Sequence, residues 1–195
     1  MSSGIFEACR DILALFSIGL AIKLMDDHLD REEADGARLP LAARLGRGVC
    51  AYTVLSYALA AWLKPSWAWT LFLASYACGM LGSGAWRLPS GLPGWLETVL
   101  AFALGVTAAG WREMASSTAF VMGVQLWDDV VDFARDRYLT RANLAQRWGR
   151  VEAALAGTAL LFIALFLAAA KTLLGLLVLP GVLYVAAAPW GKERG

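Results

Sequence analysis

Two short acidic strings in the sequence have the residue types and the spacing to bind a hard metal ion. The string DDHLD at 26–30 recurs as DDVVD at 128–132, 102 positions later. Residues three or four apart lie on one face of a helix, so each string stacks carboxylates along a stripe. Stacked carboxylates repel one another unless a cation lies between them, and oxygen-only ligands suit Mg²⁺. The candidate metal ligands are Asp26, Asp27, Asp30, Asp128, Asp129, Asp132 and Asp136.

Four of these aspartates are the expected catalytic ligands, and the other three support them. No histidine or cysteine cluster in the sequence suggests zinc. We interpret the single His28 as a solvated loop residue, with a supporting role beside the aspartates as the alternative. A simpler interpretation of both strings is that they are acidic interfacial loops balanced by arginines. The four expected catalytic ligands are Asp27, Asp30, Asp129 and Asp132.

A second pair of strings argues that the repeat is real. LAARLGR at 41–47 recurs as LAQRWGR at 144–150, 103 positions later, so the two copies differ by one inserted residue. Two independent similarities with nearly the same offset are typical of an internal duplication. We therefore predict a single domain, 1–195, with repeat halves at about 1–112 and 113–195.

The composition predicts that membrane-spanning helices carry these strings. Hydrophobic residues make up 59% of the chain and charged residues 17%, whereas a soluble domain carries about 25% charged residues. A bilayer-spanning helix needs about 20 largely apolar residues. We expect an all-α membrane bundle of about seven helices in a 4+3 pseudo-repeat. The expected spans are about 8–25, 47–63, 67–85, 95–111, 114–131, 151–169 and 172–189.

The distribution of basic residues predicts the orientation of the bundle. Arginines concentrate in 26–47 and in 127–150, and the C-terminus adds Lys192 and Arg194. With seven spans, all these segments lie on one side, which the positive-inside rule makes cytoplasmic. Four spans separate the two acidic strings, so both reach this side and can converge there. We expect an integral protein of a bacterial or archaeal cell membrane, with cytoplasmic active-site loops.

The second motif region resembles a signature of the UbiA superfamily of intramembrane prenyltransferases. The segment 129–136 has the DxxDxxxD spacing of the second family motif. The segment 140–149 resembles the basic stretch that follows this motif in the family. Family members typically have nine helices, and this chain is expected to lack one before the first motif and one at the C-terminus.

The first motif region also resembles the family pattern, with departures. Asp26 stands where the family has asparagine, and Ala34 stands where it has a third aspartate, with Asp35 displaced by one. The string Arg38-Leu39-Pro40 partly matches the Arg-Pro element of the family. The similarity is confined to the two motif regions, and elsewhere only the expected helix pattern agrees.

The resemblance implies a site for an isoprenoid diphosphate, in which Mg²⁺ bridges the aspartates and the diphosphate. Lys23 has a structural alternative, which is to extend to the membrane interface, and Arg87 could instead anchor a helix end. Trp86 and Trp127 are candidates for stabilising an allylic cation, although tryptophan also lines membrane interfaces and cores. The candidate diphosphate-binding residues are Lys23, Arg38, Arg87, Arg137 and Arg141.

The resemblance implies a Mg²⁺-dependent prenyltransferase whose partners are the isoprenoid diphosphate, the lipid bilayer and an aromatic or lipid acceptor. A terpene cyclase that acts on the diphosphate alone and a non-catalytic isoprenoid-binding membrane protein stay open as alternatives. The string 35–38 superficially matches part of the CDP-alcohol phosphotransferase signature, but the rest of that signature is absent. No basic stripe interleaved with aromatic residues suggests nucleic acid as a partner.

Overall fold

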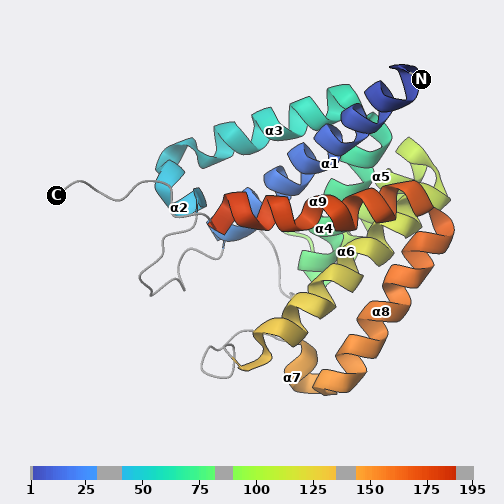
Figure 1. The fold of residues 1–195 in the computed structure, drawn as a ribbon. Helices are drawn as coiled ribbons and strands as arrows, with labels where there is room; N and C mark the ends of the chain where they lie inside the picture. The colour runs from blue at the N-terminus through green and yellow to red at the C-terminus, as the bar shows by residue number, and fades with distance from the viewer. Residues whose placement is uncertain (1, 30–40, 82–89, 135–143, 188–195) are drawn as a thin grey trace. The chain divides into compact units, whose positions relative to one another are not determined.

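The computed structural model describes residues 2–29, 41–81, 90–134 and 144–187. Within these ranges the regular structure is helical and no strand is present, so the all-α prediction is confirmed. Each of the seven expected spans corresponds to one long helix (Figure 1). The long helices are α1 (Ser2–Leu29), α3 (Val49–Leu63), α4 (Pro65–Leu81), α5 (Gly94–Ala109), α6 (Trp111–Val131), α8 (Arg150–Leu167) and α9 (Ala169–Ala187).

Within the described ranges, four short elements accompany the long helices. Two of them, α2 (Leu41–Leu45) and α7 (Leu144–Trp148), contain the repeated LAxR strings. The other two are 3-10 turns, η2 (Gly46–Gly48) and η3 (Asp132–Ala134). The string-bearing segments are therefore short helices of their own and do not extend the long helices.

Single residues separate consecutive long helices at three places, and the sequence explains each break. Lys64 ends α3, and the proline after it suits the first position of α4, where no backbone N–H is needed. Gly110 separates α5 from α6 with φ of 89°, a conformation that favours glycine. Ala168 separates α8 from α9 with backbone angles close to those of Lys64.

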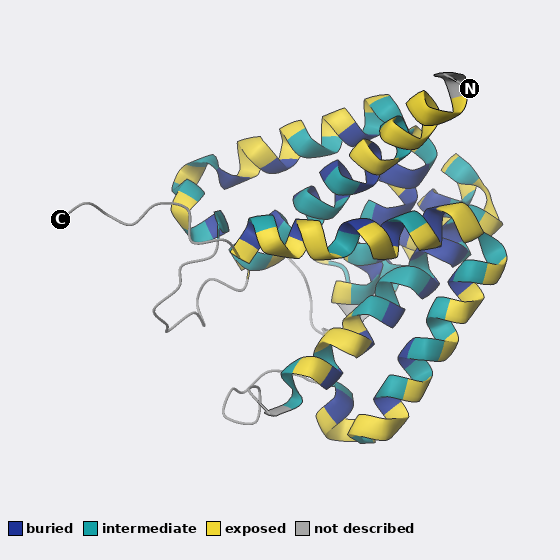
Figure 2. Cartoon of the chain, viewed as in Figure 1, coloured by how far each residue is buried: buried dark blue, intermediate teal, exposed yellow. Residues whose placement is uncertain are grey.

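Two of the described helices, α8 and α9, are long and apolar enough to cross a membrane, and α5 is a shorter apolar helix. A core helix of a soluble protein would be mostly buried, but only 17% of the α8 window and 33% of the α9 window are buried. Figure 2 shows exposed residues along both helices, including Phe162, Phe166 and Leu177. This exposed apolar surface supports membrane residence, and a bundle of seven spans stays a prediction.

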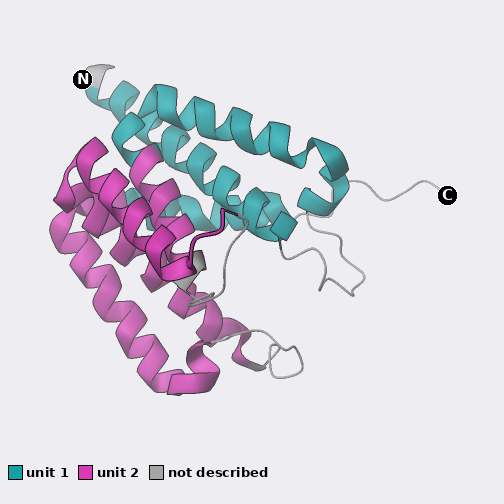
Figure 3. Cartoon of the chain, turned by 180° about the vertical axis from the view of Figure 1, so that it is seen from behind, with its two compact units in different colours: residues 1–68, 173–195 teal, residues 69–172 magenta. Residues whose placement is uncertain are grey.

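The chain divides into two compact units (Figure 3). Unit 1 contains residues 1–68 and 173–195, and unit 2 contains residues 69–172. The boundaries fall inside α4 and α9, so each of these helices contributes its two ends to different units. The predicted halves at 1–112 and 113–195 stay a prediction.

In unit 1, α1 packs against α3, and the short α2 closes the end of this pair. The core at that end contains Leu24, Ala42 and Val49, each almost completely buried. Helix α9 also approaches α1, because a Cβ atom at Gly19 would lie 3.1 Å from Cγ2 of Val182. The end of α1 that carries the first acidic string is thus fixed by apolar contacts just before the string.

In unit 2, α6 packs against α8, and α7 closes the end of this pair. The core at that end contains Leu126, Val130, Ala145 and Ala153. Further along, Gly123 and Gly157 let the two backbones approach closely, since a Cβ at Gly157 would lie 3.2 Å from the carbonyl oxygen of Gly123.

The two units repeat the same local arrangement. In each, a long helix ends in an acidic string, a short helix follows, and a second long helix packs back against the first. Ala42 and Ala145 hold equivalent places in the short helices and are both fully buried. Gly46 and Gly149 follow them, both with positive φ, at 56° and 109°. The sequence repeat therefore corresponds to a repeated three-dimensional unit.

Candidate functional site

Asp26 and Asp27 of the first acidic string lie on the last turn of α1. Lys23, one turn earlier, places Nζ 2.9 Å from Oδ1 of Asp27 and 3.3 Å from Oδ2 of Asp26. The spacing of three and four residues puts the three side chains on one helix face. Asp27 is the better enclosed carboxylate, with 14% of its side chain exposed against 58% for Asp26. The first string thus carries its own cation.

His28 belongs to the same last turn and is half-buried. Its interpretation as a solvated loop residue is therefore wrong. Nδ1 is buried and has no hydrogen-bond partner among the parts of the chain that the structure describes. Buried ring nitrogens normally have a partner, so this atom is available for one beside the aspartates.

The second acidic string ends α6. Asp128 and Asp129 lie on its last turn, and Asp132 starts η3 with φ of −84° and ψ of 2°. Asp128 is exposed, whereas Asp129 and Asp132 are half-buried. Oδ2 of Asp129 accepts a hydrogen bond of 2.9 Å from the backbone N–H of Leu144, the first residue of α7.

This hydrogen bond joins the acidic string and the LAxR string of the second copy. The first N–H groups of a helix have no partner inside the helix, and a carboxylate is a strong acceptor for them. Leu126 and Val130 add apolar contacts to Ala145 on the same short helix. The two strings of the second copy are therefore one structural element, joined by a hydrogen bond and a small core.

The equivalent of Lys23 in the second copy is Gln125, which is exposed. The described part of the first string thus combines one lysine with two carboxylates. The described part of the second string has three carboxylates, and the lysine position is neutral. The two copies thus differ in charge at this position, where the first has a cation and the second a neutral side chain.

Several predicted site residues lie outside the described residues, and their roles stay predictions. The first string belongs to unit 1 and the second to unit 2, so the convergence of the two strings also stays a prediction. Within the described ranges, no three carboxylate, histidine or cysteine side chains form a group that could hold a metal ion. The predicted residues outside these ranges are Asp30, Asp136, Arg38, Arg87, Arg137, Arg141 and Trp86.

Trp127, a candidate for stabilising an allylic cation, packs against α8. A Cβ atom at Gly157 would lie 3.1 Å from Cδ1 of its indole ring. The indole therefore contributes to the close packing of α6 and α8. Its predicted role toward a cation stays a prediction.

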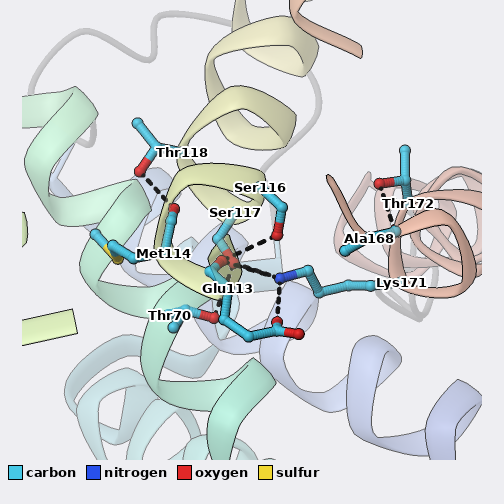
Figure 4. Close-up of polar contacts among 9 residues, drawn as sticks. All are labelled: Thr70, Glu113, Met114, Ser116, Ser117, Thr118, Ala168, Lys171 and Thr172. Carbon is cyan, nitrogen blue, oxygen red and sulfur yellow. Dashed lines mark hydrogen bonds and ion pairs between the residues drawn. The ribbon is translucent and has the colours of Figure 1, made fainter. Parts of the chain in front are cut away.

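Sequence reasoning missed a buried polar cluster at the other end of α6 (Figure 4). Lys171 is only 3% exposed, and its Nζ lies 2.6 Å from Oε2 of Glu113 and 3.0 Å from Oγ of Ser117. It also donates to the Glu113 carbonyl oxygen at 3.1 Å, and Ser117 donates to Oγ1 of Thr70 at 2.8 Å. Lys171 falls between the expected spans 151–169 and 172–189, whereas in the structure it belongs to the first turn of α9, which begins at Ala169.

A second missed cluster centres on Glu97, in the first turn of α5. The carboxylate accepts hydrogen bonds from the hydroxyl groups of Tyr76, on α4, and Ser90. Only 7% of Glu97 is exposed. A sequence signal for it exists, because Glu97 is a single carboxylate inside the expected span 95–111, and ionisable residues inside spans are typically functional.

No family model, curated protein or solved structure matches this chain. The resemblance to a known family consequently depends on the two motif regions. The local geometry of the two motif regions is the further evidence that bears on the function.

Proposed function

We propose that this chain is a Mg²⁺-dependent intramembrane prenyltransferase of the UbiA type. It ionises an allylic isoprenoid diphosphate and transfers the prenyl group to an acceptor. The observation that supports this most is the repeated element in which an acidic string ends a long helix and a short helix closes over it. A duplicated carboxylate site at the ends of apolar helices suits a substrate with a charged head and an apolar tail.

The donor set fits a hard cation, because the described ligand candidates supply carboxylate oxygens. In this proposal Asp27, Asp30, Asp129 and Asp132 hold Mg²⁺, with the three remaining aspartates of the strings in support. Mg²⁺ bound there neutralises the charge that develops on the departing diphosphate.

Protein cations complete the binding of the diphosphate in this proposal. Lys23 already lies between two carboxylates, where it can donate to a phosphate oxygen while it keeps Asp27 in place. Its ion pair also argues against the alternative in which Lys23 only extends to the membrane interface. Arg38, Arg87, Arg137 and Arg141 are the further candidates.

The test is an assay of the purified protein in lipid nanodiscs. The protein is incubated with C10 to C20 allylic diphosphates, with and without a panel of phenols and long-chain alcohols, in Mg²⁺ or in EDTA. We expect Mg²⁺-dependent release of pyrophosphate and a prenylated acceptor. Release of pyrophosphate with a hydrocarbon or terpene alcohol, without acceptor, indicates the cyclase instead.

Two outcomes contradict the proposal. One is the absence of pyrophosphate release with every diphosphate and acceptor, which favours a non-catalytic isoprenoid-binding protein. The other is binding of a non-hydrolysable diphosphate analogue that EDTA leaves unchanged, since the metal site is then not part of substrate binding.

A further inference from the structure

Glu97 is an unusual residue for its helix. It is the one charged side chain of α5, whose sequence is otherwise apolar apart from two threonines. Burying a carboxylate in apolar surroundings is unfavourable unless it is hydrogen-bonded, and near a membrane interior it typically marks a functional group. Tyr76 and Ser90 supply these hydrogen bonds, one to each carboxylate oxygen. Both donors are neutral, so they hold the carboxylate in place without cancelling its charge.

The helix lengths within unit 2 place Glu97 relative to the second acidic string. Helices α5 and α6 are antiparallel around Gly110, where Met114 packs against Gly105. Glu97 precedes Gly105 by eight residues, about 12 Å, and Asp128 follows Met114 by fourteen residues, about 21 Å. The carboxylate of Glu97 therefore lies about 9 Å closer to the middle of the helices than the acidic string.

A second, independent measurement along α4 agrees. Thr70 of α4 is hydrogen-bonded to Ser117 near the start of α6, and Tyr76 contacts Glu97 at the start of α5, so α4 is antiparallel to α5 and parallel to α6. Thr70 and Ser117 are hydrogen-bonded and mark a common level on α4 and α6. Tyr76 lies about 9 Å beyond this level and Asp128 about 16 Å beyond it. Tyr76 and Glu97 thus lie one to two helical turns inside the level of the acidic string.

The inference rests on the proposed function, because the position of Glu97 along the helices matters only when a diphosphate binds at the acidic string. A diphosphate held by the second acidic string at the end of α6 directs its apolar prenyl chain toward the middle of the helices. The carbon that reacts is bonded to the diphosphate and lies just inside it. A group one to two turns further inside is next to the acceptor that attacks this carbon.

We propose that Glu97 is the proton acceptor of the transfer and that the acceptor substrate is a hydroxyl compound. The bond between carbon and diphosphate oxygen breaks, and its electron pair leaves with the diphosphate. A lone pair of the hydroxyl oxygen forms the new bond to carbon. The hydroxyl proton moves to the Glu97 carboxylate, which Tyr76 and Ser90 keep oriented.

A purely structural role, in which Glu97 only ties α4 to α5, makes a different prediction. Glu97→Gln keeps the shape of the side chain and an oxygen that accepts a hydrogen bond, but the amide cannot take up a proton. A structural tie should survive this change largely intact, whereas proton transfer should not.

The test compares wild-type protein, Glu97→Gln, Glu97→Asp and the control Glu152→Gln in nanodiscs. Glu152 is an exposed carboxylate in the first turn of α8 and has no place in the proposal. With a C10 to C20 allylic diphosphate and the acceptor panel, we expect Glu97→Gln to lower kcat for product formation about 100-fold or more. We expect its KM for the diphosphate and its Mg²⁺-dependent binding of a non-hydrolysable analogue to stay within twofold of wild type.

Glu97→Asp should keep part of the turnover, and the thermal midpoint should show that each variant folds. The inference is overturned if Glu97→Gln keeps kcat within twofold, as a structural tie that survives the change predicts, or if it loses analogue binding and turnover together, because the binding site itself is then disrupted. Should Glu97→Gln not fold, Tyr76→Phe gives the second measurement, with an expected drop in kcat at unchanged analogue binding; equal kcat overturns the inference. Absence of pyrophosphate release by wild-type protein contradicts the proposed function itself and is visible without any variant.

Discussion

The acidic strings of the two units end equivalent helices, yet their carboxylates are held in different ways. In unit 1, a lysine one turn earlier forms an ion pair with Asp27 at 2.9 Å. In unit 2, Gln125 stands at the lysine position, and Asp129 instead accepts a backbone N–H from α7. The two copies thus share an arrangement of helices but differ in the side chain four residues before the equivalent aspartates. Lys23 thus pairs with the first string, whereas a hydrogen bond joins the second string to the short helix that follows it.

The opposite ends of the same helices show a second repeated feature. Asp11 of α1 and Glu113 of α6 are also 102 positions apart. Each forms an ion pair with a lysine at a junction between two later helices, Lys64 between α3 and α4 and Lys171 in the first turn of α9. Lys64 lies 2.8 Å from Oδ1 of Asp11 and stays half-exposed, with its Nζ 4.5 Å from the ring of Trp67. Lys171 is buried. The lysine is therefore much better enclosed in unit 2 than in unit 1, so its loss should cost more there.

The largest effect is expected at the second acidic string. Asp129→Ala removes a proposed Mg²⁺ ligand and the hydrogen-bond acceptor of Leu144. We expect turnover to fall by about 10² or more, because the charge on the leaving group grows in the transition state. Asp26→Ala, at an exposed position of the first string, should lower turnover much less. Pyrophosphate release in nanodiscs measures both, and equal losses would contradict the asymmetry.

The next largest effect concerns stability. Lys171→Met removes the ion-pair partner of Glu113 and one hydrogen bond to Ser117, and it should lower the free energy of unfolding by about 3 kcal/mol. Lys64→Met, at the more exposed pair, should cost about 1 kcal/mol or less. Unfolding in a denaturing detergent titration measures the two variants under the same conditions. A double variant, Lys171→Met with Glu113→Gln, should recover part of the loss, and no recovery would indicate that the lysine acts mainly by its volume.

A smaller effect is expected where the helix pairs cross. Gly123→Ala places a Cβ 2.9 Å from Cγ of Leu161, so the α6–α8 pair must separate, at a cost of about 1–3 kcal/mol.

Thr53, in the equivalent part of α3, is buried with Oγ1 lacking a described hydrogen-bond partner. Thr53→Val keeps the shape and removes this hydroxyl, so it should be neutral or stabilising. The same unfolding titration compares them, and a tolerated Gly123→Ala would disprove the close crossing.

The smallest effect is expected from a change of charge at Gln125, which stands at the lysine position of the second copy. Gln125→Lys restores to unit 2 the cation that unit 1 has, and a pair at this spacing contributes about 0.5 kcal/mol. We expect the apparent Mg²⁺ affinity for binding a diphosphate analogue to fall about twofold. Gln125→Glu should shift it in the opposite direction. Calorimetric titration with Mg²⁺ measures both, and shifts of the same sign would exclude a charge effect.

The sequence predicted the long helices well because each is a nearly continuous apolar run between Gly, Pro or charged residues. It also predicted the repeat, since the strings are short and distinctive. It did not predict that Asp129 contacts Leu144, because periodicity identifies a helix face without identifying the atoms that meet it. Lys171 was misplaced for a related reason. Composition suggests that a lysine between two apolar runs belongs to a turn, whereas the contacts with Glu113 and Ser117 allow it inside α9.

The backbone N–H of Leu144 has a practical consequence as a spectroscopic reporter. Its hydrogen bond to Oδ2 of Asp129 weakens when a cation draws electron density from that carboxylate. A selectively ¹⁵N-labelled leucine sample therefore provides an amide resonance that senses metal occupancy of the second string. This readout needs no substrate and no turnover. It can follow titration of the resting protein even before any acceptor is known.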